Sequence, residues 1–228
     1  MTFVWTFGGG FGIFSPYFMS GYEIGGCMTK LTKTLIVVGI IVFTVGSVVS
    51  CVSGTYNGMV EQEERVTAQW AQVQNVYQRR FDLIPNLVST VKGYAKHENE
   101  TFTQLAEARA KAGGVTNIDS SVIDNPEKLA EFQKMQDSLS GALRRLLVVT
   151  ENYPELKANQ NFLALQDELE GTENRIAVER KKFNDFAQSY NTTIRRFPGA
   201  FLANLFGFKA KAYFSAATEA ASAPKVEF

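Results

Sequence analysis

Histidine and cysteine are nearly absent from this sequence. Its 228 residues include one histidine, His97, and two cysteines, Cys27 and Cys51. With one histidine, neither a Ser/His/Asp set nor an HExxH metal motif can be assembled. Both cysteines lie at or before the end of the N-terminal apolar region, which excludes a zinc site or a disulfide framework from the rest of the chain. We therefore predict no catalytic residue, no metal site and no cofactor.

An excess of charge of one sign is also missing. The 23 Lys and Arg residues balance the 23 Asp and Glu residues, so nothing indicates nucleic acid as a partner. Gly113-Gly114 lacks the Lys-Ser/Thr of a phosphate-binding loop, and no small-molecule substrate is indicated. Glu168, Glu170 and Glu173 would need Glu-x-x-His partners to hold two metals in a helical bundle. We expect them to form an ion-paired, solvated helix face instead.

Charged residues are missing altogether from residues 34–60. The centre of this stretch, residues 35–49, is strongly apolar, and with its flanks it reaches the roughly 20 residues that span a bilayer. Lys30 and Lys33 precede it, whereas the first charges after it are acidic. The positive-inside rule therefore predicts a single-pass cell membrane protein with a cytoplasmic N-terminus and its body on the extracytoplasmic side.

Two alternatives stay open at this end of the chain. Residues 1–27 are rich in glycine and aromatics, and are either a wrongly assigned extension before a start at Met28 or a short tail at the membrane. Residues 48–51, Val-Val-Ser-Cys, match a lipobox, so cleavage there would leave Cys51 lipidated. The domains we predict are a poorly ordered extension (1–27), an anchor or signal (28–54), a helical bundle (55–192) and a basic, aromatic C-terminal segment with its tail (193–228).

Apolar residues recur every three or four positions through the body, which predicts helices and no strands. Gly113-Gly114 and Tyr153-Pro154 are expected to end two helices, and Asn125-Pro126 to begin one. The apolar stripes are Val66, Trp70, Val73 and Tyr77; Leu87, Val91, Tyr94, Phe102 and Leu105; Leu129, Phe132, Met135, Leu139, Leu143 and Leu146; and Phe162, Leu165, Leu169, Ile176, Phe183, Phe186 and Tyr190.

The central motif of the body is residues 78–98, QRRFDLIPNLVSTVKGYAKHE. Pro85 disfavours a helical conformation for Ile84, and Asp82 is a suitable N-cap for a new helix. A mere kink would leave one helix of about 55 residues overhanging its partners, whereas a reversal gives four helices of matched length. We predict the reversal, and thus an all-α protein with an N-terminal transmembrane helix followed by an antiparallel up-and-down four-helix bundle.

Several short motifs together resemble the LemA family of bacteria. They are Tyr56-Asn57, Gln69-Trp70, residues 79–98, Ala108-Arg109, the GTENRI of residues 171–176 and Tyr190-Asn191. The long central motif is specific, and the resemblance extends over residues 29–214. It implies a membrane-anchored helical bundle whose molecular function is unknown.

Two groups of residues are candidates for binding. The first is a partner-binding surface at the membrane-distal tip, formed by arginines and aromatics at the corner; the alternative is a set of core aromatics beside a salt-bridged corner. Its members are Trp70, Tyr77, Arg79, Arg80, Asp82 and Tyr94.

The second group is a membrane interface, because residues 195–214 carry four basic side chains and no acid. The alternative is that its rings cap the open end of the core. Its members are Arg195, Arg196, Phe197, Phe201, Phe206 and Phe208, with Lys209 and Lys211 as the other cations.

These features favour a non-enzymatic protein of the bacterial cell envelope, acting as an adaptor or scaffold for other membrane or envelope proteins. The alternative is a structural protein that assembles with its own copies or binds membrane lipid, with lipidation at Cys51 as one means of attachment.

Overall fold

The computed structural model describes residues 29–113 and 120–215, and the chain divides into two compact units, Met1–Val49 and Ser50–Phe228. The predictions for residues 1–27 lie outside the described residues. All regular structure in the described ranges is helical, which confirms the all-α class. The elements are α1 (Lys30–Tyr94), α2 (Asn99–Ala112), the short 3-10 helix η2 (Ser120–Asp124), α3 (Pro126–Thr150), α4 (Pro154–Lys157), α5 (Gln160–Arg195) and α6 (Gly199–Phe206).

In the first unit, the part of α1 before Ser50 exposes its large apolar side chains, among them Leu35, Ile40 and Phe43. A helix that exposes apolar side chains over such a length is poorly suited to water and well suited to a hydrocarbon environment. Within the described residues, α1 is the one helix that is long and apolar enough to cross a membrane. Its composition and length therefore fit the predicted anchor.

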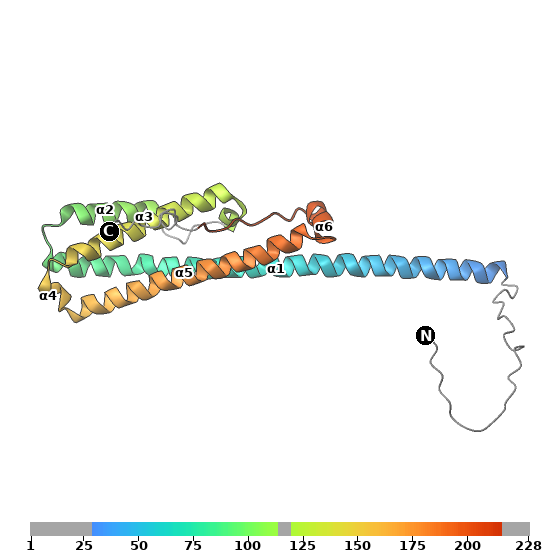
Figure 1. Ribbon diagram of the computed structural model, residues 1–228, viewed down its shortest axis with the longest axis horizontal. Helices are drawn as coiled ribbons and strands as arrows, with labels where there is room; N and C mark the ends of the chain where they lie inside the picture. The colour runs from blue at the N-terminus through green and yellow to red at the C-terminus, as the bar shows by residue number, and fades with distance from the viewer. Residues whose placement is uncertain (1–28, 114–119, 216–228) are drawn as a thin grey trace, which may run out of the picture. The chain divides into compact units, whose positions relative to one another are not determined.

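In the second unit, the later part of α1 lies alongside α2, α3 and α5 (Figure 1). Their apolar faces enclose two core clusters. The first core contains Met59, Val66, Trp70, Val73, Tyr77, Ile123, Leu129, Phe132, Ile176, Phe183, Ala187, Tyr190, Ile194, Leu202, Ala203, Ala212 and Phe214. The second contains Ile84, Leu87, Val91, Ala95, Phe102, Leu105, Ala108, Ala112, Leu139, Ala142, Leu143, Leu146, Leu156, Phe162 and Leu169.

The two cores differ in what completes them. Helices α1, α3 and α5 contribute to both, but α2 contributes only to the second core. In the first core the place of a fourth helix is taken by η2, α6 and an extended segment of residues 207–215, which we term the C-terminal strap. Helix α2 is too short to reach the first core, and residues near the C-terminal end cover that core instead.

The predicted reversal at Asp82–Pro85 is wrong, because α1 continues through Pro85 to Tyr94. A proline inside a helix loses one hydrogen bond and costs about 3 kcal/mol. Here Pro85 lies on the exposed side of α1, so the lost bond faces water. Ile84, Leu87 and Val91 remain buried on the opposite face, and burying such side chains contributes roughly 1.5–3 kcal/mol each. Packing on both sides of the proline therefore outweighs the break.

The stripe predicted from Leu87 to Leu105 is also divided, because α1 ends at Tyr94 and α2 begins at Asn99. The predicted boundaries at Gly113, Asn125 and Tyr153-Pro154 agree with the structure. Asn125 caps α3, its side chain accepting hydrogen bonds from the backbone N–H of Glu127 at 2.8 Å and of Lys128 at 3.2 Å, with Pro126 as the first helical residue. Gly113 follows α2 with φ of 62°, a conformation that favours glycine. Helix α3 ends shortly before Tyr153-Pro154, as expected.

Candidate functional site

A buried arginine lies where the two cores meet. The side chain of Arg80 is 1 % exposed and pairs with the Glu173 carboxylate at 2.8 Å. The Arg80 guanidinium also donates to Ser140 Oγ at 2.6 Å and to the side-chain oxygen of Gln136, and it lies 5.1 Å from the centre of the Tyr77 ring. Arg80 on α1, Gln136 on α3 and Glu173 on α5 each fall between members of the first and second cores. They form a polar layer across the body.

This polar layer constrains how the helices align. A buried charge without a partner is strongly destabilising, so Arg80 fixes α3 and α5 in the alignment that brings Gln136 and Glu173 to it. Burial raises the pKa of Tyr77 to about 12, although Arg180 and Arg80 oppose the shift. The Tyr77 hydroxyl therefore stays neutral at physiological pH.

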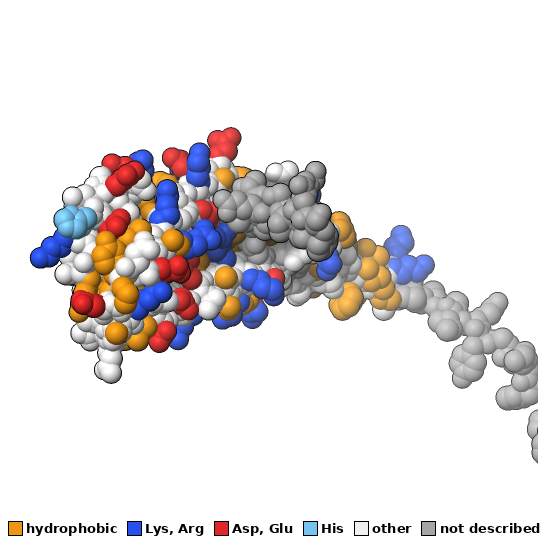
Figure 2. All heavy atoms as spheres, turned by 60° about the vertical axis from the view of Figure 1, so that its left-hand side comes forward, with side chains coloured by type: hydrophobic (Ala, Val, Ile, Leu, Met, Phe, Trp, Pro, Cys, Tyr) orange, Lys and Arg blue, Asp and Glu red, His pale blue; other side chains and the backbone are white. Residues whose placement is uncertain are grey.

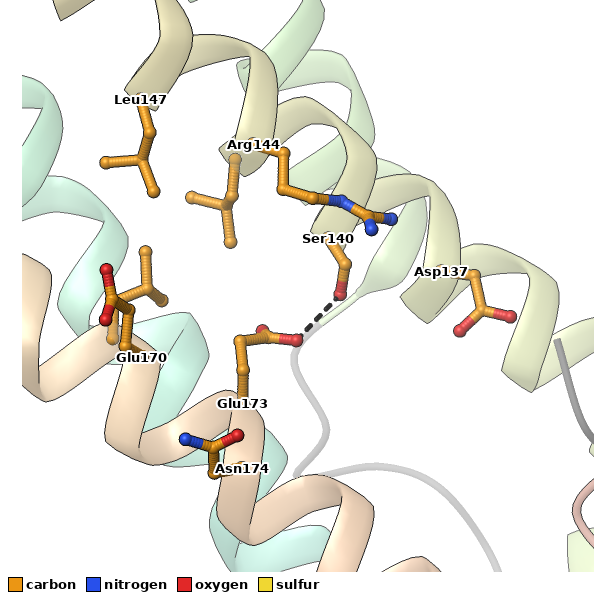
Figure 3. Close-up of a pocket in the computed structure, with 9 residues that line it drawn as sticks. Asp137, Ser140, Arg144, Leu147, Glu170, Glu173 and Asn174 are labelled. Carbon is orange, nitrogen blue, oxygen red and sulfur yellow. Dashed lines mark hydrogen bonds between the residues drawn. The ribbon is translucent and has the colours of Figure 1, made fainter. Parts of the chain in front are cut away.

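A pocket of about 470 Å³ opens between α3 and α5 beside this layer. Figure 3 shows Glu173 pointing toward Ser140 across the pocket, and the two side chains are joined by a hydrogen bond of 3.2 Å. Leucines form the apolar part of its lining and charged or amide side chains the polar part. The lining residues are Asp137, Ser140, Leu143, Arg144, Leu147, Leu169, Glu170, Glu173 and Asn174.

The pocket is lined by leucines and by polar side chains that can form hydrogen bonds. Its carboxylates are engaged: Glu173 pairs with Arg80, and Asp137 lies 3.6 Å from the Arg180 guanidinium. Glu170 accepts a hydrogen bond from Gln166 at 3.1 Å. In the described residues, no group of three His, Cys, Asp or Glu side chains is placed to hold a metal ion.

The six predicted partner-binding residues do not form one surface. Trp70, Tyr77 and Arg80 are buried, as the alternative of packed aromatics and a salt-bridged arginine expects. Arg79 and Asp82 are accessible in the middle of α1, away from any helix end. Arg79 pairs with Glu168 at 2.9 Å.

The sixth residue, Tyr94, lies about 18 Å from Asp82 along the helix, since an α-helix rises 1.5 Å per residue. The Tyr94 hydroxyl accepts a hydrogen bond from the Asn159 side chain at 2.9 Å. The end of the body that carries the histidine faces the viewer in Figure 2, where acidic, basic and apolar side chains are interspersed. Arg79, Asp82 and Tyr94 thus remain accessible at two separate places.

The predicted membrane-interface residues divide into two classes. Arg195, Arg196, Phe197, Phe201 and Phe206 are exposed, on or just before α6. Phe208, in contrast, is half-buried: its ring packs edge-on against Tyr56, with the ring centres 5.6 Å apart, and it borders the first core. The alternative of core capping therefore applies to the strap, and lipid contact of the α6 region stays a prediction.

Three amide side chains hold the strap by paired hydrogen bonds to its backbone. The Asn191 side chain accepts a hydrogen bond from the N–H of Lys211 and donates one to its C=O, each at 2.8 Å. The Asn184 side chain makes the same pair of hydrogen bonds with the backbone of Phe214, each at 2.9 Å. Gln133 bonds the N–H and C=O of Ser215 at 3.2 and 3.0 Å. The backbone N–H and C=O groups of an extended segment need hydrogen-bond partners outside that segment. These three side chains provide such partners, as a neighbouring strand would in a sheet.

Lys211 was expected to face lipid, and this expectation is wrong. The Lys211 ammonium is buried and bonds the Glu63 and Asp124 carboxylates at 2.7 Å each. Burial alone would lower its pKa, but the hydrogen bonds to Asp124 and Glu63 prevail and raise it. The acids that pair with Lys211 lie far away in the sequence, so the run of basic residues gave no sign of them.

Cys51 is exposed and unpaired on α1. The first unit ends two residues before it, at Val49, so Cys51 belongs to the second unit, and α1 is continuous through this position. Its lipidation stays a prediction.

Comparison with known proteins gives a consistent set of relatives. The LemA family model matches residues 69–228. Magnetosome protein MamQ of Magnetospirillum gryphiswaldense and MamQ 2 of Paramagnetospirillum magneticum are each 28 % identical over 174 residues, which is 70 % of this chain and 64 % of theirs. Protein LemA of Metamycoplasma hominis is 26 % identical over 156 residues, covering 68 % of this chain and 67 % of its own. The chain thus spans less than two thirds of the length of the MamQ relatives.

Proposed function

This chain belongs to the LemA family, and from that premise we propose that it is a membrane-anchored, non-enzymatic scaffold of the bacterial cell envelope that binds other envelope proteins. We further propose that α1, α2, α3 and α5 form an antiparallel, up-and-down four-helix body on the extracytoplasmic side. The charges support this orientation, since Lys30 and Lys33 precede the apolar stretch and Glu61, Glu63 and Glu64 follow it.

The observation that carries the proposal is the pocket between α3 and α5. Leu143, Leu147 and Leu169 give it an apolar lining, and charged and amide side chains surround them. Apolar centres with polar rims are typical of surfaces that bind other proteins. The carboxylates of the pocket are paired with arginines or an amide, an arrangement that suits recognition better than acid–base chemistry. The relatives' names, MamQ and LemA, designate no reaction either.

Site-specific photocrosslinking in cells tests this proposal. A photoreactive residue replaces Arg144 at the pocket, and a matched control replaces Lys181, whose side chain is 80 % exposed on α5. We expect discrete crosslinks to other envelope proteins from position 144, weaker or different ones from position 181, and loss of the former when Glu170→Lys reverses a charge of the pocket. Identical patterns from both positions would contradict a scaffold role for the pocket.

A second candidate is a structural protein that assembles with copies of itself or binds lipid. The exposed phenylalanines of α6 favour it, because such residues are usually covered in the working state of a protein. The same experiment separates the candidates: a ladder of crosslinked copies of this chain would favour self-assembly over a scaffold for other proteins.

A further inference from the structure

Three apolar side chains project from the α6 region into solvent. Phe197, Phe201 and Leu205 are 92 %, 69 % and 66 % exposed. Phe201 and Leu205 are four residues apart on α6, so they lie on one face of the helix, and Phe197 lies two residues before the helix begins. We call these three side chains the α6 apolar face.

The opposite side of α6 packs against α5 and the first core. A Cβ atom at Gly199 would lie 2.4 Å from the backbone oxygen of Thr193, so only glycine allows α6 to approach α5 this closely. Leu202 and Ala203 are buried in the first core, and the Phe206 ring packs against the Tyr56 ring at 4.9 Å. These contacts hold the α6 apolar face outward, because turning it inward would expose Leu202 and Ala203.

The charged side chains within this segment have one sign. Arg195, Arg196 and Lys209 are exposed beside it, and no acidic residue occurs in residues 195–215. The remaining cation of the segment, Lys211, is already paired with Glu63 and Asp124. Within the described residues, Arg195, Arg196 and Lys209 form no ion pair, which leaves these three cations for an anionic partner.

We propose that the α6 apolar face, with Arg195, Arg196 and Lys209, inserts into the interface of an anionic lipid bilayer. Apolar rings surrounded by basic side chains are suited to that environment, and each cation near an anionic surface strengthens attraction by about fivefold. The proposal rests on the membrane anchorage proposed above. Tyr56, which contacts α6, follows the apolar stretch of residues 35–49 by seven residues in the sequence.

A fluorescent reporter on the full-length chain tests this inference. Cys27→Ser and Cys51→Ser leave one cysteine, introduced by Asn204→Cys at an exposed position of α6, for an environment-sensitive dye. The chain is reconstituted in vesicles of phosphatidylcholine and phosphatidylglycerol. We expect the dye emission to be shifted to the blue and to be quenched by nitroxides attached to the lipids. The blue shift should decrease when Arg195, Arg196 and Lys209 are changed to Gln. Val148→Cys, an exposed position on α3, serves as the matched control.

One further variant and three possible outcomes complete the test. Phe197→Ser, Phe201→Ser and Leu205→Ser together should abolish the blue shift while leaving the melting temperature unchanged, because the three side chains are exposed. If the chain floats with the vesicles but the dye at position 204 responds as at position 148, this inference alone is wrong. A blue shift that nitroxides do not quench and that grows with protein density would assign the face to a second copy and overturn it. A chain that does not float contradicts the proposed anchorage as well.

Discussion

Arg80 and Glu173 are partners with unequal access to water. The Arg80 side chain is 1 % exposed and that of Glu173 is 38 % exposed. If Glu173 is removed, the guanidinium stays buried with only neutral partners; if Arg80 is removed, the carboxylate can hydrate. The stability of the pair is thus determined mainly by the need to neutralise a buried cation.

Glu173→Gln is therefore expected to lower the free energy of unfolding by about 3 kcal/mol, the lower end of what breaking a buried pair costs. Arg80→Met should cost less, since Met fills much of the same space. Arg79→Met, which breaks the exposed pair with Glu168, should change stability by less than about 1 kcal/mol. Urea unfolding of the three variants measures this order, and a larger loss from Arg80→Met than from Glu173→Gln would contradict it.

Tyr77 should make stability fall at alkaline pH. Its pKa is 10.0 in the unfolded chain and about 12 in the folded protein. The folded state thus favours the protonated hydroxyl, and its contribution is complete below pH 10 and lost as the pH rises toward 12. The loss amounts to about 3 kcal/mol, since each pKa unit corresponds to about 1.4 kcal/mol.

Tyr77→Phe should remove this part of the alkaline transition while leaving stability at pH 7 little changed, because the hydroxyl has no hydrogen-bond partner in the described parts of the chain. Melting temperatures across pH 9–12 measure it. Tyr153, Tyr190 and Lys211, whose pKa values are also raised, remain in the variant and contribute the residual slope. An unaltered pH profile would show that Tyr77 is not the responsible group.

At the scale of elements, the C-terminal strap takes the place that α2 leaves open. The Phe214 ring stacks on Trp70 with the ring centres 6.1 Å apart and meets Phe183 edge-on at 5.5 Å. Paired amide bonds from Asn184 fix the strap backbone at the same residue. The strap is therefore part of the first core.

Phe214→Ala is accordingly expected to lower the free energy of unfolding by about 3 kcal/mol, the usual cost of a large-to-small change at a buried aromatic. Phe201→Ala is the matched control, since the Phe201 side chain is exposed, and should stay within about 0.5 kcal/mol. Chemical denaturation of both proteins compares the two values. Equal effects would mean that the strap does not seal the core.

Pro85 gives the second prediction for an element. Because α1 is continuous and Pro85 lies on its exposed side, Pro85→Ala restores a backbone hydrogen bond without disturbing the core. We expect a gain in unfolding free energy of roughly 1–3 kcal/mol, up to the usual cost of an interior proline. A loss of stability on this substitution would instead indicate that the chain needs a break there.

At the scale of the whole molecule, the apolar part of α1 predicts firm attachment to membranes. Burial of some 20 apolar residues does not depend on electrostatic attraction, so the protein should remain in the membrane pellet after washing with high salt.

Cys51→Ala then distinguishes a spanning helix from a lipid anchor. We expect unchanged electrophoretic mobility and unchanged membrane association, measured together with metabolic labelling by a fatty acid. A larger precursor and loss of the lipid label would show that the chain is normally cleaved just before Cys51 and that Cys51 is lipidated.

The sequence determined the all-helical class, the apolar anchor stretch and the caps at Gly113 and Asn125, because periodicity, hydrophobic length and capping act over a few neighbouring residues. The family resemblance was also evident from short motifs, and the family match confirms it. These properties need no knowledge of what packs against what.

Only the tertiary structure decided the rest. Whether Pro85 ends α1 depends on partners for Ile84, Leu87 and Val91 that come from other helices. Arg80 finds Gln136 and Glu173, and Lys211 finds Glu63 and Asp124, at positions remote in the sequence. Long-range packing and charge pairing thus moved Arg80 and Lys211 from the predicted surface into the interior, and left Arg195, Arg196 and the α6 apolar face outside.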